Sequence, residues 1–145
     1  NPLDFHLVGN YTDSNTITVL GVKTDAAGIY GGAGYVNPLA GLTLPKLNFT
    51  LSSTYEQGPY EFTAQTRFRG SARISPYYVE GVDIDDNWIA PVAYLDLRGS
   101  YHWTEATQLF FAVDNVFNTP PAELGGSQVY DQLGRSFRAG VRFVD

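Results

Sequence analysis

The chain has 145 residues, enough for one ordinary domain, and it contains neither cysteine nor methionine, so disulfides and thiolate metal sites are excluded. No run approaches the ~18 consecutive apolar residues of a membrane-spanning helix. The net charge of −6 argues against non-specific binding to nucleic acid, which depends on basic residues. Because translation starts at methionine, we expect Asn1 to mark a processed or excised chain rather than a native start.

The composition favours an all-β fold. Tyrosine (10), phenylalanine (9) and glycine (15) are abundant, and no stretch keeps apolar residues at helical spacing over several turns. The first predicted strand is Leu3–Tyr11, in which alternate residues are apolar. A long glycine-rich loop, Thr12–Lys46, follows, with a short strand predicted only at Ile17–Val22.

The clearest hairpin is predicted in residues 47–68. Leu47–Tyr55 and Tyr60–Phe68 both alternate apolar and polar side chains. A two-residue turn at Gln57-Gly58, pairing Tyr55 with Tyr60, brings the two apolar sets to the same face. Gly58 can supply the positive φ that such a turn requires.

A second pair of strands is predicted after the aromatic and acidic loop Gly70–Pro91. These strands are Tyr94–Trp103 and Gln108–Phe117, and their apolar residues share a face if the turn holds three residues, Glu105 to Thr107. This turn places Trp103 beside Leu109 and Arg98 opposite Asp114. Ser136–Asp145 is predicted as the final strand, with arginines alternating with apolar residues.

The predicted fold is an antiparallel up-and-down meander of about six strands of roughly ten residues, which is typical of a transmembrane β-barrel wall. Tight turns lie at one end, and three long loops lie at the other: Thr12–Lys46, Gly70–Pro91 and Asn118–Arg135. In such a barrel the apolar faces contact lipid and the charged faces line a wet lumen. The aromatic residues near the short turns fit an interfacial girdle: Tyr55, Tyr60, Tyr101 and Trp103.

Several short motifs support a more specific resemblance. They are Leu44-Pro45-Lys46, Tyr94-Leu95-Asp96-Leu97, Asn115-Val116-Phe117-Asn118 with Pro120 and Pro121, Tyr130, Gly134-Arg135, and the closing residues Gly140 and Phe143. In this combination the chain resembles the C-terminal end of TonB-dependent outer-membrane receptors. The resemblance covers most of the chain after Leu44, and one departure is that Val144-Asp145 follows Phe143, where these receptors usually end on an aromatic residue.

The resemblance implies that residues 1–145 are the C-terminal portion of a barrel of about 22 strands, without its plug domain. It implies a Gram-negative outer membrane as the location, with membrane lipid, the rest of the barrel, the plug and TonB as partners. It also implies energised import of a small ligand such as a ferric siderophore. The residues that carry the family motif are Asn115, Phe117, Gly134, Arg135 and Phe143.

Candidate ligand-binding residues lie in the external loop Gly70–Pro91, because external loops commonly bear binding residues. They are Tyr77, Tyr78, Asp83, Asp85 and Trp88. The acids resemble a calcium loop in spacing, but Trp88 occupies the position that needs glycine. We therefore expect no metal site, no cofactor and no catalytic residues.

Two other interpretations remain open from the sequence. One is a soluble β-sandwich that binds a ligand such as carbohydrate through Tyr77, Tyr78 and Trp88, with its apolar faces meeting across a dry core. The other is a hydrolase that uses paired acids such as Asp83 and Asp86, which requires two carboxylates to converge in one pocket.

Overall fold

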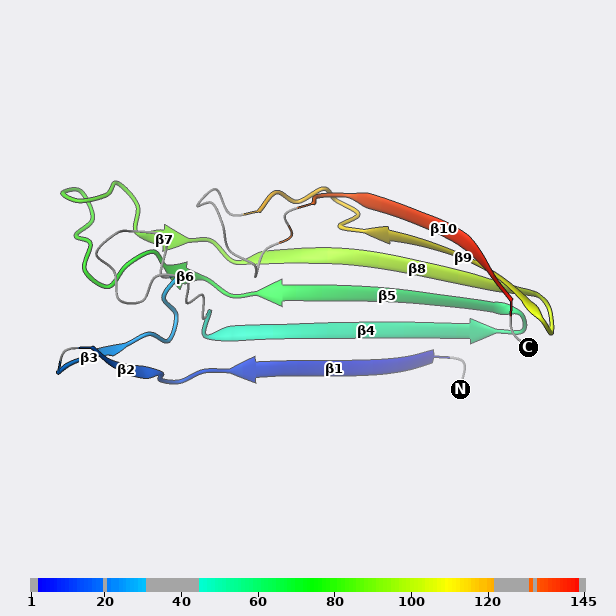
Figure 1. Cartoon of the computed structure of the whole chain (residues 1–145), viewed down its shortest axis with the longest axis horizontal. Coiled ribbons are helices and arrows are strands. Elements are labelled where there is room, and N and C mark those ends of the chain that lie inside the picture. Colours follow the sequence, from blue (N-terminus) through cyan, green and yellow to red (C-terminus); the bar gives the residue numbers. More distant parts are fainter. Residues whose placement is uncertain (1–2, 20, 31–44, 122–130, 132, 144–145) are drawn as a thin grey trace.

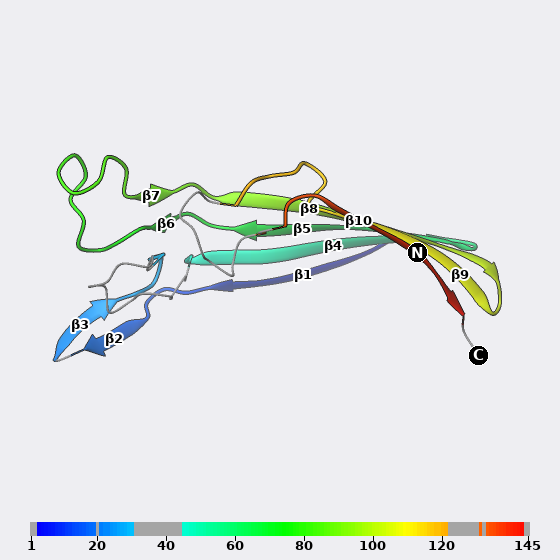
Figure 2. The ribbon, with the colours of Figure 1, turned by 45° about the horizontal axis from the view of Figure 1, so that its top comes forward.

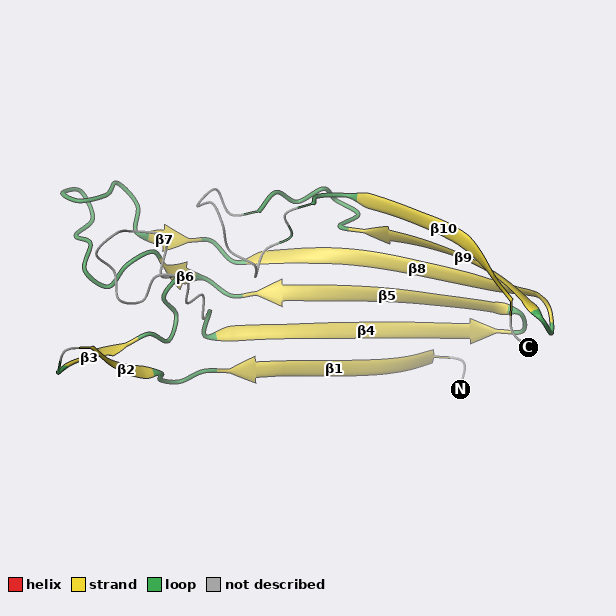
Figure 3. Ribbon diagram, viewed as in Figure 1, coloured by secondary structure: helices red, strands yellow, loops and turns green. Residues whose placement is uncertain are grey.

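A computed structural model describes residues 3–19, 21–30, 45–121, 131 and 133–143. Within this part of the chain all regular elements are strands, and there is no helix that could span a membrane (Figure 3). The long strands are β1 (Leu3–Tyr11), β4 (Leu47–Gln57), β5 (Tyr60–Arg69), β8 (Val92–Thr104), β9 (Thr107–Asp114) and β10 (Ser136–Phe143). They form one antiparallel sheet of six strands in the order β1-β4-β5-β8-β9-β10 (Figure 1). The predicted meander is confirmed, and the sheet is not closed.

Four short strands lie outside this sheet. They are β2 (Thr16–Val19), β3 (Val22–Asp25), β6 (Ala72–Arg73) and β7 (Trp88–Ile89). The single strand predicted at Ile17–Val22 is wrong, because β2 and β3 form a hairpin with Gly21 between them at a φ of 83°. Asp25 closes the base of this hairpin by accepting hydrogen bonds from the backbone N–H groups of Asn15 (2.8 Å) and Ala27 (3.0 Å), which lower the pKa of its carboxyl group.

The short connections between strands lie at one end of the sheet, and the long connections lie at the other end. The β4–β5 and β8–β9 turns lie together at one end, as Figure 1 shows. The β2–β3 and β6–β7 hairpins lie beyond the other end, which we call the loop end. The turned view in Figure 2 shows the six long strands as one curved and twisted layer. The predicted asymmetry between short turns and long loops is therefore confirmed.

One face of this layer is apolar and uncovered. A single row of paired residues crosses all six strands on this face: Leu3, Tyr55, Phe62, Gly99, Phe111 and Ala139. The apolar face remains open to its surroundings, since Leu7 is 66% exposed and Phe137 is 71% exposed. The buried apolar clusters of the described residues lie instead at the loop end, around Ile29 and around Ile89.

The opposite face is polar. One row of paired residues on this face contains Asp4, Thr54, Thr63, Arg98, Ala112 and Arg138. A neighbouring row contains His6, Ser52, Gln65 and Asp96. This alternation follows from the period of two in a strand. The sequence prediction of which residues share a face is confirmed along the sheet.

The predicted pairing of β4 with β5 is shifted by two residues. Gln57 pairs with Tyr60 and Tyr55 pairs with Phe62, so the turn is Gly58-Pro59 rather than Gln57-Gly58. Gly58 has the expected positive φ, 57°. Pro59 has no N–H to donate to a strand partner, and a turn position avoids that loss. The shift is an even number of residues, so the faces still match.

The predicted pairing of β8 with β9 is also wrong by two residues. His102 pairs with Gln108 and Thr104 with Thr107, and Trp103 between them is the irregular residue of a β-bulge. The extra residue allows a tight turn at Glu105-Ala106 in place of the predicted three-residue turn. Arg98 consequently pairs with Ala112 rather than with Asp114.

Several strand ends differ from the prediction, most of them by one or two residues. β9 ends at Asp114, three residues before the predicted Phe117, because the next residue, Asn115, has a φ of 52° and leaves the strand conformation. β10 is described to Phe143. The predicted continuation through Val144-Asp145, and the motif residues Leu44 and Tyr130, lie outside the described residues.

Candidate functional site

A buried carboxylate ties the polar face of the sheet to the segment after β9. Asp96 is 2% exposed and accepts two hydrogen bonds from Arg67, from Nε to Oδ2 (2.6 Å) and from Nη2 to Oδ1 (2.9 Å). The same Nη2 donates to Oδ2 of Asp131 (3.0 Å). The Arg67 guanidinium also lies over the Tyr94 ring, 5.1 Å from its centroid. Paired charges of this kind satisfy one another where water is scarce.

Asn115 connects the end of β9 to the same carboxylate. Its backbone N–H donates to Oδ1 of Asp96 (2.9 Å), and its side chain bonds Thr119 in both directions, donating to the carbonyl (2.8 Å) and accepting from the N–H (2.8 Å). Asn115 has no exposed surface. The motif residue therefore fixes the first turn of the β9–β10 connection, and its polar atoms are turned inward.

Of the other motif residues, Gly134 and Arg135 contact Asn118, whereas Phe117 and Phe143 are exposed. The Oδ1 atom of Asn118 accepts from the Arg135 N–H (3.0 Å), which joins the two ends of the connection; we call this contact the loop clasp. Gly134 has a φ of 69°, and a Cβ there would lie 2.9 Å from the same Oδ1 atom. Phe117 and Phe143 are 73% and 78% exposed.

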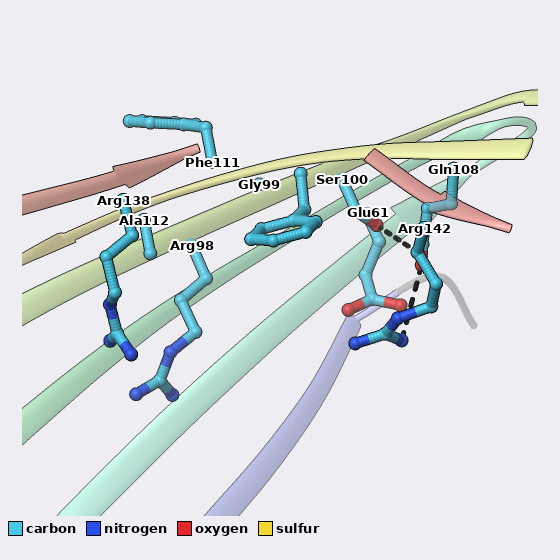
Figure 4. A pocket seen from close by; sticks show the side chains of 10 residues that line it. Glu61, Arg98, Gly99, Ser100, Gln108, Phe111, Ala112, Arg138 and Arg142 are labelled. Carbon is cyan, nitrogen blue, oxygen red and sulfur yellow. Dashed lines mark hydrogen bonds between the residues drawn. The ribbon is translucent and has the colours of Figure 1, made fainter. Parts of the chain in front are cut away.

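A second polar group lies nearer the short turns. Arg138 donates to Asp114 (2.6 Å), and Arg98 lies 4.0 Å from the same carboxylate. Arg142 donates to Gln108 Oε1 (3.4 Å). Figure 4 shows the side chains of Arg98, Arg138 and Arg142 projecting from the same side of the sheet, while Phe111 projects from the other.

The loop between β6 and β7 is organised by Asn87, which has no exposed surface. Its side chain accepts from the Ser75 N–H (3.1 Å) and donates to the carbonyls of Ser75 (2.9 Å) and Tyr78 (3.2 Å). Its own N–H donates to Glu80 Oε1 (3.2 Å). The side chain and backbone of Asn87 together thus link Ser75, Tyr78 and Glu80. This role of Asn87 was not predicted from the sequence.

The predicted ligand-binding residues are placed on and around this loop. Tyr77 (52% exposed) donates to or accepts from Thr24 through its hydroxyl (3.0 Å), Tyr78 is 42% exposed, and Trp88 is 51% exposed with the Arg73 guanidinium 5.4 Å from its ring centroid. Asp83 accepts from the Val79 N–H (2.8 Å).

Of the five predicted residues, Trp88 lines a cavity at the loop end. This cavity has a volume of about 460 Å³ and lies between the β6–β7 loop and Pro120-Pro121. Most of its lining is apolar, from Ile74, Ile84 and Ile89 among others. Asp85 is exposed and outside it. The cavity therefore contains one of the predicted aromatic residues, Trp88, together with one acid, Asp86, which was not among the five.

The hydrolase interpretation is not supported by the loop geometry. Asp83 and Asp86 each accept a hydrogen bond from a backbone N–H of their own loop, from Val79 (2.8 Å) and Trp88 (2.8 Å) respectively. Among the described residues no three acidic or histidine side chains are grouped to hold a metal ion. Asp83 and Asp86 therefore each stabilise the local loop conformation.

Neither a protein-family model nor a curated protein matches the chain. Solved structures do match. One is a mutant of the ferric enterobactin receptor PfeA from Pseudomonas aeruginosa, with a TM-score of 0.54 and 18% identity over 69% of this chain and 16% of that receptor. Another is the copper transporter OprC, with a TM-score of 0.50 and 26% identity over 70% of this chain and 17% of that transporter.

The chain has the fold of a TonB-dependent receptor barrel wall. It spans about one sixth of the length of the two solved proteins, as the coverages of 16% and 17% show. Its strands have the fold of wall strands in the Gram-negative outer membrane. The structure contradicts the sandwich fold, because no second layer covers the apolar face among the described residues.

Proposed function

We propose that the chain supplies part of the wall and of the external loops of a TonB-dependent receptor that imports a scarce ligand, such as a ferric siderophore. The observation that carries this proposal is the single sheet with one exposed apolar face and one charged face, of the same fold as two outer-membrane transport proteins. The structural neighbours are a receptor and a transporter rather than enzymes, which supports a role without chemistry on the ligand.

The wall and the loops have separate roles in this proposal. The external loops capture the ligand, and a plug domain inside the complete barrel rearranges when TonB pulls on it. The β6–β7 loop is suited to capture because Asn87 holds it in one conformation while Tyr77, Tyr78 and Trp88 stay exposed. A preorganised loop loses little conformational entropy on binding. Aromatic side chains suit an organic ligand better than a bare metal ion.

Uptake of radiolabelled ferric siderophores by cells tests this function. A strain that lacks the complete receptor should lose uptake of one siderophore, and the receptor gene should restore it only when TonB is present. The substitution Trp88→Ala should reduce ligand affinity about tenfold, as expected for an aromatic contact residue. Trp88→Phe retains a ring beside Arg73 and is the matched control. If the strain without the receptor takes up every tested siderophore as fast as the parent strain, the proposal is contradicted.

A further inference from the structure

A hollow with a volume of about 250 Å³ lies on the lumenal face, toward the short turns (Figure 4). Its principal lining residues are Glu61, Arg98, Gln108, Phe110, Arg138 and Arg142. They come from four neighbouring strands, β5, β8, β9 and β10. The function proposed above uses none of them, and nothing in that function depends on this hollow.

Strand register brings the three arginines to the rim. Arg98 and Arg138 pair with the same small residue, Ala112, from its two sides, and Arg142 pairs with Gln108 further along β10. Figure 4 shows all three guanidinium groups extending on the same side of the sheet. Ala112, between Arg98 and Arg138, is small and lines the hollow.

The floor of the hollow is aromatic, although it lies on the polar face. Phe110 pairs with Ser100 and with Gly140. A Cβ at Gly140 would lie 2.6 Å from the Cζ atom of the Phe110 ring, so the ring rests directly against the backbone of β10. Glycine is therefore required at position 140 to let the ring lie there. An apolar surface is thus placed beside three hydrogen-bond donor groups.

The rim has more cationic donors than internal acceptors. Asp114 is shared between Arg138 (2.6 Å) and Arg98 (4.0 Å), whereas the bond that the structure gives Arg142 goes to the neutral Gln108 (3.4 Å). Glu61 lies at the hollow but, among the described residues, has no cation within ion-pair distance. Each guanidinium carries five N–H donors, so most of these donors face open space. The Arg98 and Arg138 side chains are 48% and 60% exposed.

We propose that this hollow binds an oxyanion, a carboxylate or a phosphate group, whose apolar neighbour rests on Phe110. Guanidinium groups bind both anions through paired, charge-assisted hydrogen bonds. The volume of about 250 Å³ is below that of pockets for drug-sized ligands, so the guest is a side chain or a small anion. The anion has two possible sources: a carboxylate fixed on polypeptide that occupies the lumen, or a free solute.

The free source is tested with inorganic phosphate. The complete receptor that contains this chain, folded in a zwitterionic detergent, is titrated with inorganic phosphate by isothermal calorimetry at low salt. Arg142→Gln should weaken binding about tenfold, since it removes charge-assisted hydrogen bonds. Lys23→Gln makes the same charge change in β3, away from the hollow, and should bind phosphate like the wild type. The heat-modifiable migration of each variant on SDS gels verifies that its barrel is folded.

The fixed source is tested by cross-linking, because a hollow that is already filled binds no added phosphate. Arg142→Lys places a primary amine at the rim, and a carbodiimide joins an amine to a carboxylate in direct contact. In the Arg142→Lys variant, a cross-link from position 142 to an acidic residue other than Glu61 and Asp114, located by peptide mass spectrometry, supports the fixed source.

The proposal is overturned if phosphate binding is absent or insensitive to Arg142→Gln and the only cross-links reach Glu61 or Asp114. That result shows that the arginines are satisfied within the wall. Neither readout involves siderophore uptake, so failure of this proposal and failure of the import function are distinguishable.

Discussion

Asn115 meets two requirements that few residues meet together. Its φ of 52° lies in the left-handed region, which asparagine tolerates better than most residues other than glycine. Its side-chain amide also bonds both backbone polar groups of Thr119, at 2.8 Å each. The resemblance to known receptors marked this position, but the sequence alone did not reveal that its role is to end β9 and bind Asp96.

We expect Asn115→Ala to lower the free energy of unfolding by about 2–4 kcal/mol. The reasons are unpaired buried polar groups on Thr119 and a left-handed backbone at alanine. Asn115→Gly is the matched control, because it removes the same hydrogen bonds but accepts the backbone conformation, so its loss should be smaller. Urea unfolding of the complete receptor in lipid vesicles, followed by tryptophan fluorescence, measures both. Equal stability of the alanine variant and the wild type would contradict this role.

The strands show which information a sequence carries about a sheet. Alternation within each strand predicted the faces correctly, because it depends only on the period of two. Which residues pair depends on the turn, where a single residue can shift the register. Pro59 needs a position without a strand partner, which shifts the β4–β5 register, and the bulge at Trp103 shifts the β8–β9 register. Both pairings were therefore predicted two residues away from those observed. The β4–β5 shift could have been predicted from the presence of Pro59.

The charged network was beyond sequence reasoning for a similar reason. Arg67 and Asp131 are separated by 64 positions, and no local pattern links them. The β5–β8 register brings Arg67 to Asp96, and Asp131 bonds the same guanidinium from the β9–β10 connection. The aromatic loop residues, in contrast, were recognisable as candidates from composition alone, and their role in binding stays a prediction.

The neighbours His6 and Leu7 on β1 provide a test of the two faces. Arginine at Leu7, on the apolar face, should destabilise the barrel by about 2–4 kcal/mol near the middle of the membrane and reduce assembly. Arginine at His6, on the lumenal face, introduces the same side chain one residue away and should be tolerated. The amount of heat-modifiable receptor in outer membranes reports assembly. Equal amounts for the two variants would contradict the assignment of the faces.

At the scale of the whole molecule, the sheet has two unpaired edges, β1 and β10, and one uncovered apolar face. Unpaired strand edges readily pair with other chains. A large exposed apolar surface also favours association in water. The described part of the chain therefore lacks the sealed core that makes an isolated domain soluble.

The 145-residue polypeptide alone should accordingly form oligomers in plain buffer or require detergent to remain dispersed. Multi-angle light scattering after size-exclusion chromatography, with and without detergent, measures this directly. A monodisperse monomer in plain buffer would contradict this prediction, because it would require the apolar face to be shielded from water.

The loop clasp between Asn118 and Arg135 also bears on how such a receptor diversifies. Because the ends of the segment are fastened to each other at 3.0 Å, the strands on either side keep their alignment whatever lies between. Doubling the length of a closed segment costs only about 0.6 kcal/mol in chain entropy. Insertions and rewritten sequence between the fastened ends should thus be nearly neutral for folding, so this segment can vary while the sheet stays intact.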